Sequence, residues 1–403
     1  DLNRTRLGLI ATYRMMGIAP ALAIVTALVL WALQPGALAV AGPILVLWLA
    51  SPAVAWWMSR PLTRREARLT ADQTRFLRTA SRRTWAFFET FVGPEDHWLP
   101  PDNYQEHPVV ALAHRTSPTN MGLSLLANLA AYDFGYLSVR GLIERTSQTL
   151  HTMEGLEKHL GHFYNWYDTH SLKPLQPIYI SSVDSGNLAG HLLTLQPGLV
   201  ALVDAPILST RLFDGMADTF RLMADASEGT LPAPFLLFRQ TLESVSTARP
   251  TTLAAARSSL ERLATTAADG VRGLHLDAGS EADGWAQALA RQSRDALDEL
   301  LFLAPWVALP AALNGLRDDP GLSAIPTLRE VSRLEMESLP ALEQRVDAEA
   351  TAEARERLRA LRPHLEEASR RARERISTIE RLAVQAGDLA QMDYEFLFDK
   401  TRH

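Results

Sequence analysis

The first feature of the chain is a long apolar stretch: residues 15–59 contain no charged side chain, and only Gln-Pro-Gly at 34–36 interrupts it. This pattern predicts two apolar helices, over 16–33 and 38–58, each close to the roughly 20 residues that a membrane span requires. A buried hairpin in a soluble core is the alternative, but such cores rarely tolerate so long a stretch without charge. A cleaved signal peptide does not fit, because there are two segments and neither precedes a small-residue cleavage site.

Arginine residues flank the apolar pair on both sides, whereas the short link between the two segments is uncharged. They are Arg4, Arg6 and Arg14 before the first segment and Arg60, Arg64, Arg65 and Arg68 after the second. Because basic flanks stay in the cytoplasm, both ends of the pair are predicted to be cytoplasmic. We therefore expect a multi-pass protein of the inner (cytoplasmic) membrane, held in the lipid bilayer through residues 16–58, with the chain after residue 60 facing the cytoplasm.

Beyond the apolar pair, the chain is predicted to form mostly helices joined by polar loops. Leu, Ala and Arg are abundant while β-branched residues are sparse over much of the chain, and this composition favours helix. The apolar spacing predicts helices over 62–92, 121–132, 139–158, from about Ser185 onward, 199–246 with a break at 231–234, 250–275, 283–305 and 327–388. In the helix over 121–132, Leu123, Leu126, Leu129 and Ala130 are expected to face inward. Pro363 is expected to interrupt the last one.

Residues 161–191 combine aromatic, amide, hydroxyl and carboxylate side chains in a mixture unlike that of a plain core helix. The stretch includes His162, Tyr164, Asn165, Trp166, Tyr167, Asp168, Tyr179, Asp184 and Asn187. Flat rings can cover the apolar faces of a sugar while polar tips bind its hydroxyl groups. The stretch therefore predicts a carbohydrate-binding surface. A second loop, 93–108, carries similar residues and is open to two interpretations, a pocket rim or a solvated turn.

The charge, the cysteine content and the absence of known motifs exclude several kinds of partner and site. A net charge of −6 and a pI near 6.0 argue against a nucleic-acid partner. The absence of cysteine excludes disulfides and thiolate metal sites. No P-loop, Rossmann glycine fingerprint, HExxH or Gly-x-Ser-x-Gly motif occurs, and His162 and His170 are too far apart for an i,i+4 metal pair. We therefore predict neither a cofactor nor a metal site.

Cleavage or transfer of a glycosidic bond needs two carboxyl groups, one to protonate the leaving oxygen and one to act at the anomeric carbon or on the nucleophile. The weak candidates in this chain are Asp168, Asp184, Asp393 and Glu395. Asp184 has the best setting, since it lies at a helix start within the aromatic and polar stretch. An ordinary helix cap is the competing interpretation. For Asp393 and Glu395 the competing interpretation is a simple exposed edge of a strand or helix.

Four motifs resemble the glucoamylase-like middle region of cyclic β-1,2-glucan synthases. They are HRTSPTNMGL (114–123), GHFYNWYDT (161–169), SVDSGNLAGHL (182–192) and MDYEFLFD (392–399). The resemblance implies a mostly α fold, in which two transmembrane helices precede an incomplete (α/α)6 toroid with a long helical insertion. It also implies that a linear β-1,2-glucan is closed into a ring by anomer-retaining transglycosylation.

Carried over residue by residue, the resemblance implies a glucan site lined by Asn120, His162, Tyr164, Asn165, Trp166, Asp168, Asp184, Ser185 and Asn187. The catalytic residues stay unknown, because in such synthases the acidic residues expected to act lie beyond the segment similar to 392–399. The chain is therefore expected to be a fragment, with the remaining domains of the same polypeptide as partners. A β-glucan hydrolase of the same fold and a non-catalytic, membrane-anchored glycan-binding module stay open as alternatives.

This interpretation divides the chain into four parts. Residues 1–61 form the membrane-spanning hairpin, and residues 62–200 form the first helices and substrate loops of the toroid. Residues 201–390 form a long helical region that packs on the toroid or is inserted in it. Residues 391–403 begin the following toroid segment.

Overall fold

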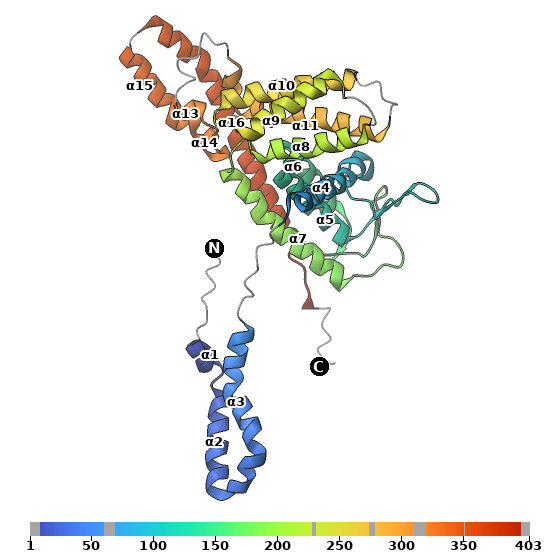
Figure 1. Ribbon diagram of the computed structural model, residues 1–403, viewed down its shortest axis with the longest axis vertical. Helices are drawn as coiled ribbons and strands as arrows, with labels where there is room; N and C mark the ends of the chain where they lie inside the picture. The colour runs from blue at the N-terminus through green and yellow to red at the C-terminus, as the bar shows by residue number, and fades with distance from the viewer. Residues whose placement is uncertain are drawn as a thin grey trace. The chain divides into compact units, whose positions relative to one another are not determined.

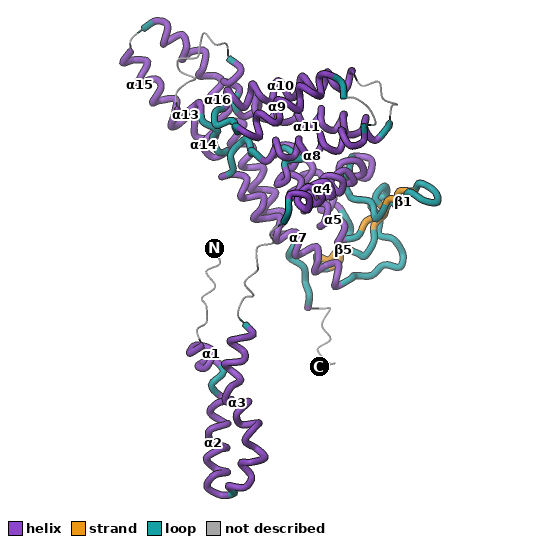
Figure 2. Tube along the Cα trace, in the orientation of Figure 1, coloured by secondary structure: helices purple, strands orange, loops and turns teal. Residues whose placement is uncertain are grey.

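The computed structural model describes residues 9–59, 69–227, 231–273, 279–309, 320–349 and 351–395. The chain divides into two compact units, residues 1–70 and residues 71–403. Both are mostly helical, and the short strands found among the described residues lie between helices of the second unit (Figure 2). The prediction of a mostly α fold is therefore confirmed.

The first unit is a helical hairpin. Its helices are α1 (Leu9–Met15), α2 (Ile18–Leu33) and α3 (Leu38–Met58), and the 3-10 turn η1 (Pro35–Ala37) joins the last two (Figure 1). α1 and α2 meet at an angle of 72°. The turn lies where the Gln-Pro-Gly sequence predicts it, because proline ends the preceding helix and suits the first position of a new one.

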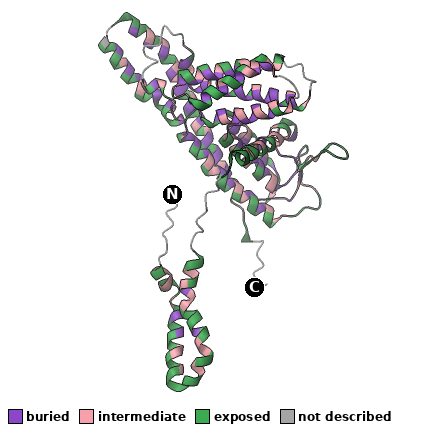
Figure 3. Cartoon of the chain, in the orientation of Figure 1, coloured by how far each residue is buried: buried purple, intermediate pink, exposed green. Residues whose placement is uncertain are grey.

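The apolar side chains of this hairpin are largely uncovered. Only 11% of the most apolar part of Pro35–Met58 is buried, and Figure 3 shows exposed and intermediate residues along most of α2 and α3. Within the hairpin itself, the helices therefore leave most of each other's apolar side chains uncovered. By length and composition, Pro35–Met58 can cross a membrane, and the bent pair α1–α2 can count as one further span.

The second unit holds the remaining elements. Its helices are α4 (Ala71–Phe91), α5 (Pro118–Phe134), α6 (Val139–Gly155), α7 (Ser182–Ala201), α8 (Arg211–Ala226), α9 (Ala233–Thr247), α10 (Leu253–Gly273), α11 (Glu281–Leu303), α13 (Pro320–Ser323), α14 (Leu328–Arg333), α15 (Leu339–Glu349) and α16 (Ala352–Leu389). Short helical turns are η2 (Pro94–Asp96), η3 (Leu202–Asp204), η4 (Pro305–Ala308) and η6 (Leu334–Ser338). The strands β1 (Tyr104–Gln105), β2 (Ala111–Leu112), β3 (Arg115–Thr116), β4 (Lys158–His159), β5 (His162–Phe163) and β6 (Tyr167–Asp168) pair in antiparallel ladders β1–β2, β3–β6 and β4–β5.

α5 and α7 pack against each other and run in the same direction. Near their starts the Thr119 hydroxyl donates to Asp184, and three to four turns further along the side chain of Leu129 lies against Gly198. A Cβ at position 198 would lie 2.5 Å from Leu129 Cδ2, so any other residue there would require the Leu129 side chain to move. The parallel arrangement places the first turns of both helices at the same end of the pair.

α6 lies between these two helices in sequence and packs on α5 in the opposite direction. Gly135 ends α5 in the left-handed conformation (φ +80°), as the sequence predicts, and a Cβ there would collide with the carbonyl of Arg211. The chain then turns back, and Arg145 of α6 donates to the side chain of Asn128 of α5. The antiparallel pair α5 and α6 is thus followed by α7, which is parallel to α5.

The helices α8, α9, α10 and α11 form a second group, in which each packs on its neighbours (Figure 1). α16 joins the two groups, because it packs on α6 and α7 as well as on α11 and α14. The core between them is rich in leucine and alanine, including Leu300, Leu365 and Ala372, all of which are fully buried. The long helix therefore holds the unit together along its length.

Two expectations about individual helices are wrong. α16 continues through Pro363, because the packing of a 38-residue helix outweighs the one backbone hydrogen bond that proline removes. In α5, Leu123 is 47% exposed and Ala130 is exposed as well, whereas the buried face holds Met121, Leu125 and Asn128. α5 is apolar on most of its sides, so apolar spacing does not identify the side that faces α7.

A buried ion pair fixes α16 against α11. The guanidinium of Arg375 donates through both terminal nitrogens to the carboxylate of Glu299, and both residues are at most 9% exposed. Burial raises the pKa of Glu299, and the neighbouring Arg375 opposes that rise. The charge of Glu299 is therefore tolerated in the core because the cation accompanies it.

We expect Arg375→Met to lower the free energy of unfolding by about 3–5 kcal/mol near neutral pH, because the substitution leaves a buried carboxylate without its cation. A raised folded-state pKa gives stability that is present below the unfolded pKa and lost as pH rises. The loss in the variant should therefore shrink as pH falls toward the ordinary glutamate pKa of about 4.3. Denaturant unfolding across this pH range measures both effects.

The matched control is Arg370→Met, which removes an arginine from the exposed side of the same helix. It should change stability little, because exposed ion pairs are worth little. A loss in Arg375→Met that equals the control, or that does not vary with pH, would contradict the assignment of a buried pair.

Candidate functional site

Sequence segments that lie far apart in the chain meet at the starts of α5 and α7. β3 and β6 form an antiparallel ladder in which Arg115 is opposite Asp168. The Thr119 hydroxyl of α5 donates to Asp184 of α7. After α16, the hydroxyl of Tyr394 lies 3.5 Å from the first-turn carbonyl of Ser185. Parts of all four motifs identified in the sequence therefore lie together.

Asp184 connects the first turns of the two parallel helices. The cap of α7 is Ser181, whose hydroxyl accepts from the backbone N–H of Asp184, so Asp184 is not the capping residue. Its Oδ1 accepts from the Thr119 hydroxyl at 2.6 Å, and the Asn187 amide donates to the same hydroxyl oxygen at 3.2 Å. A carboxylate is favoured at this position because the positive ends of two helix dipoles meet there.

Trp166 is held from one side by Arg115. The Arg115 guanidinium lies 4.8 Å from the centroid of the Trp166 ring, within the range of a cation–π contact. Arg115 is itself fixed by Asp102, whose Oδ2 accepts from Nε at 3.1 Å and from Nη2 at 2.9 Å. The Asn120 amide donates to the other oxygen of Asp102 at 3.4 Å. An indole ring, a cation, an amide and a carboxylate thus form one connected array.

His162 is fully buried and links α7 to the segment after α16. Its Nε2 lies 2.7 Å from the carbonyl oxygen of Asp393, which can only accept, so this nitrogen carries the hydrogen. Its Nδ1 lies 2.8 Å from Ser185 Oγ and, in the neutral ring, accepts from that hydroxyl. Tyr394 packs edge-on against the ring at 4.9 Å between centroids. His162 therefore positions other groups.

The carboxylate candidates differ in their surroundings. Asp168 accepts from the backbone N–H of Ser171 at 2.7 Å and from its hydroxyl at 2.8 Å, and these bonds lower the pKa of Asp168. A general acid needs a raised pKa, so Asp168 does not fit that role. Asp393 and Glu395 are exposed, and the Asp393 carboxylate accepts from the Glu395 backbone N–H at 2.8 Å.

The predicted site residues fall into two groups. Asn120, Tyr164, Trp166, Asp168, Asp184 and Asn187 are exposed or half-buried, whereas His162, Asn165 and Ser185 are buried. The buried residues hold the loops in place: the Asn165 backbone N–H, for example, donates to the carbonyl of Tyr179 at 2.9 Å. Residues 396–399, the second half of the last motif, lie outside the described residues.

Three side chains outside the predicted set of glucan-site residues also contribute. We define the polar surface as Asp102, Arg115, Thr119, Asn120, Trp166, Asp184 and Asn187. Arg115 and Thr119 lie inside the first motif, and their polar character next to Asn120 is the signal that could have identified them. Asp102 belongs to the loop that sequence reasoning left open, and its bond to Arg115 places that loop at the polar surface.

No protein-family model matches the chain. Over 217 residues, which are 53% of the chain, it is 41% identical to the cyclic β-(1,2)-glucan synthase NdvB of Rhizobium meliloti (strain 1021). This similarity confirms the resemblance found in the motifs. The matched part is 8% of the length of that protein.

Among solved structures, the chain is similar to a protein of Bacteroides fragilis NCTC 9343 assigned as a glucoamylase. The two are 17% identical, with a TM-score of 0.23 over 42% of this chain and 34% of the other. A likeness of this size does not establish the toroidal arrangement that the motif resemblance implies.

We expect Ser185→Ala to destabilise the second unit by about 1–3 kcal/mol, because the buried Nδ1 of His162 loses its donor. Ser182→Ala, at an exposed position one turn earlier on the same helix, should stay within about 0.5 kcal/mol of the parent chain. Thermal or denaturant unfolding compares the two. Equal effects in both variants would show that the hydrogen bond from Ser185 to His162 does not support this site.

Proposed function

We propose that this region binds a linear β-1,2-glucan at the polar surface and takes part in closing it into a ring by anomer-retaining transglycosylation. One observation carries the proposal: the segments that resemble cyclic β-1,2-glucan synthases, although separated by up to about 280 residues in sequence, lie together at the starts of α5 and α7. The nature of the glucan rests on the similarity to a cyclic β-(1,2)-glucan synthase. The enzyme is the larger polypeptide, and this region contributes a wall of its site.

The polar surface has the chemistry that a glucan needs. Trp166 supplies a flat ring for a sugar face, and its orientation is fixed by Arg115. Asp184 and Asn187 present a carboxylate and an amide, which accept from and donate to hydroxyl groups. Because Thr119 already bonds to both of these side chains, they are held in place before a ligand arrives. Preorganised groups bind with a smaller entropic cost.

We also propose that α5, α6 and α7 are the first helices of an (α/α)6 toroid. In such a fold the chain alternates between an inner and an outer ring, so helices of one ring are parallel to one another. The parallel contact between α5 and α7, with the antiparallel α6 between them in sequence, supports this arrangement. In this proposal the long helical region 201–390 packs on the toroid.

The apolar hairpin is proposed to cross the inner membrane twice, with the second unit on the cytoplasmic side. The uncovered apolar side chains of α2 and α3 support a lipid environment, and the arginine residues on either side of the hairpin in sequence support the orientation. The polar surface would then face the cytoplasm.

A non-catalytic glycan-binding role for this region is the second candidate, and one observation favours it. The pKa of Asp168 is lowered by Ser171, whereas a glycosidic acid needs a raised pKa. One oxygen of the Asp184 carboxylate, Oδ1, already accepts from the Thr119 hydroxyl. We therefore propose that Asp184 binds substrate and that the acid–base pair is contributed by other parts of the larger polypeptide.

We expect Trp166→Ala to weaken the binding of a linear β-1,2-glucan oligosaccharide about tenfold or more, because it removes the ring on which a sugar would stack. Asn187→Ala, at an exposed position, should weaken binding with less effect on folding. Isothermal titration of the detergent-solubilised chain measures both affinities.

The matched control is Phe76→Ala, which removes a ring that is 70% exposed on α4, outside the four motifs. It should bind like the parent chain. If Trp166→Ala and Asn187→Ala bind the oligosaccharide as tightly as the control, the polar surface is not the glucan site.

A product assay on the full-length polypeptide separates ring closure from hydrolysis. Transglycosylation within one chain should give cyclic products that lack a reducing end and are lighter by one water than the linear glucan of the same length. Mass spectrometry and a reducing-end assay detect the difference. Linear products with new reducing ends would show that water, rather than a sugar hydroxyl, attacks the intermediate.

A further inference from the structure

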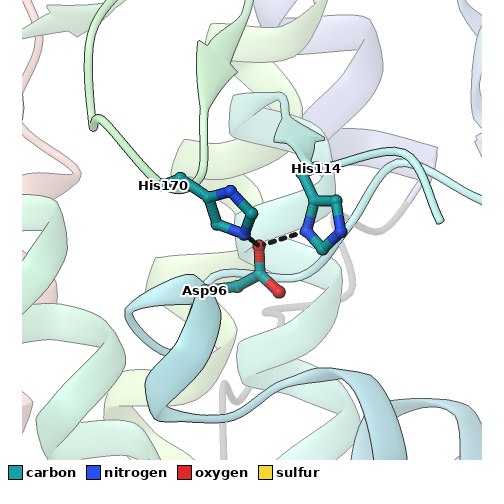
Figure 4. A group of neighbouring side chains, drawn as sticks. All are labelled: Asp96, His114 and His170. Carbon is teal, nitrogen blue, oxygen red and sulfur yellow. Dashed lines mark hydrogen bonds and ion pairs between the residues drawn. The ribbon is translucent and has the colours of Figure 1, made fainter.

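Three side chains from separate loops meet beside the polar surface: Asp96, His114 and His170 (Figure 4). Asp96 is the last residue of η2, His114 directly precedes β3, and His170 follows β6 by two residues. The β3–β6 ladder brings the two histidines together, since the Thr169 backbone N–H also donates to the His114 carbonyl at 3.1 Å. Sequence reasoning missed this group, because it tested only a pair of histidines on one helix.

The ligand atoms of the three side chains converge on one point. His114 Nδ1 lies 2.8 Å from Asp96 Oδ1, and His170 Nε2 lies 3.4 Å from the same oxygen. All three atoms lie within 4.8 Å of one another. A tetrahedral ion with bonds of about 2.0–2.2 Å places its ligand atoms roughly 3.3–3.5 Å apart, so small shifts would bring this group into coordination distance.

The surroundings of Asp96 suit a ligand carboxylate. Asp96 is only 4% exposed, and the Thr169 hydroxyl donates to its Oδ1. Carboxylates that bind metals are commonly oriented by such hydrogen bonds from neighbouring groups. The side chains of His114 and His170 are 40% and 55% exposed, so solvent can reach the point where the three ligand atoms meet. An ion would thus have a path to the site and room for water as a further ligand.

We propose that Asp96, His114 and His170 bind a divalent transition-metal ion of the zinc type, through the carboxylate oxygen, His114 Nδ1 and His170 Nε2. Two imidazoles and one carboxylate are a donor set that such ions accept. The ion would tie three loops together. Since Arg115 follows His114 directly, the ion would also fix the β3–β6 ladder that carries Arg115 beside Trp166. It would act as a structural clamp at the edge of the polar surface, outside the surface itself.

The same three side chains could instead form a hydrogen-bonded group without an ion. In Figure 4 both rings point toward Asp96, and the ring centroids lie 4.2 Å apart. In such a group, the Thr169 hydroxyl and one histidine already supply two hydrogen-bond donors to the carboxylate of Asp96. The convergence of a second histidine nitrogen on the same oxygen is what favours an ion, because one carboxylate oxygen then serves three partners.

Metal titration of the full chain in detergent tests the proposal. Zn²⁺ should bind with a stoichiometry of one, measured by competition with a chromophoric chelator, and Co²⁺ should give the visible absorption of a low-symmetry, four-coordinate ion. His170→Asn and His114→Asn should each weaken Zn²⁺ binding about tenfold or more and abolish the Co²⁺ absorption. His364→Asn, on α16, is the control and should bind like the parent chain.

The circular dichroism of each variant shows whether it folds, and His170→Asn is the safest variant because its side chain is the most exposed of the three. The proposal is overturned if the parent chain binds no Zn²⁺, or if both histidine variants bind it as the control does. Neither result bears on glucan binding, which is measured separately with the oligosaccharide in metal-free buffer.

Discussion

The close parallel packing of α5 on α7 is the constraint on which the site depends. Glycine lies at two of its close contacts: Gly198 is against the end of the Leu129 side chain, and a Cβ at Gly122 would collide with the ring of His191. Because the helices are parallel, their first turns lie at the same end, and the positive ends of their dipoles are shared by Asp184. Any shift between the helices would separate Asp184 from Thr119 and divide the polar surface.

Around this helix pair, the buried polar groups hold segments together, whereas the exposed polar groups are available to a ligand. His162 and Ser185 are both buried. Through its two ring nitrogens, His162 of β5 binds Ser185 of α7 and the Asp393 carbonyl in the segment after α16. Trp166, Asp184 and Asn187 reach solvent and are held by partners of their own. The four motifs contain both kinds of residue, so a motif by itself does not separate ligand contacts from supporting residues.

Much of this could be predicted from sequence, for reasons that differ between residues. The apolar helices and the end of α5 at Gly135 follow from local rules of charge, propensity and backbone conformation, and the structure has them where the sequence predicts them. The inward face of α5 could not be predicted, since Leu123 and Leu125 are equally apolar and only packing on α7 distinguishes them. The continuation of α16 through Pro363 could not be predicted either, because tertiary packing overrides the local tendency of proline to end a helix.

Contacts between distant segments were the hardest to predict. Asp102 meets Arg115 because the β1–β2 ladder folds the chain back on itself, and His114 meets His170 because the β3–β6 ladder joins their loops. Asp96 reaches the two histidines from a third loop. No spacing in the sequence encodes such a group. The motifs predicted which residue types matter, and the fold supplied their partners.

Hydrogen–deuterium exchange of the detergent-solubilised chain, with and without a linear β-1,2-glucan oligosaccharide, tests the central claim most directly. The claim is that separate segments form one glucan-binding surface. The account predicts that the ligand slows exchange together in peptides that cover residues 115–123, 164–168 and 182–188, and leaves α9 and α10 unchanged. Slower exchange confined to another part of the chain, or no change at a saturating ligand concentration, would contradict it.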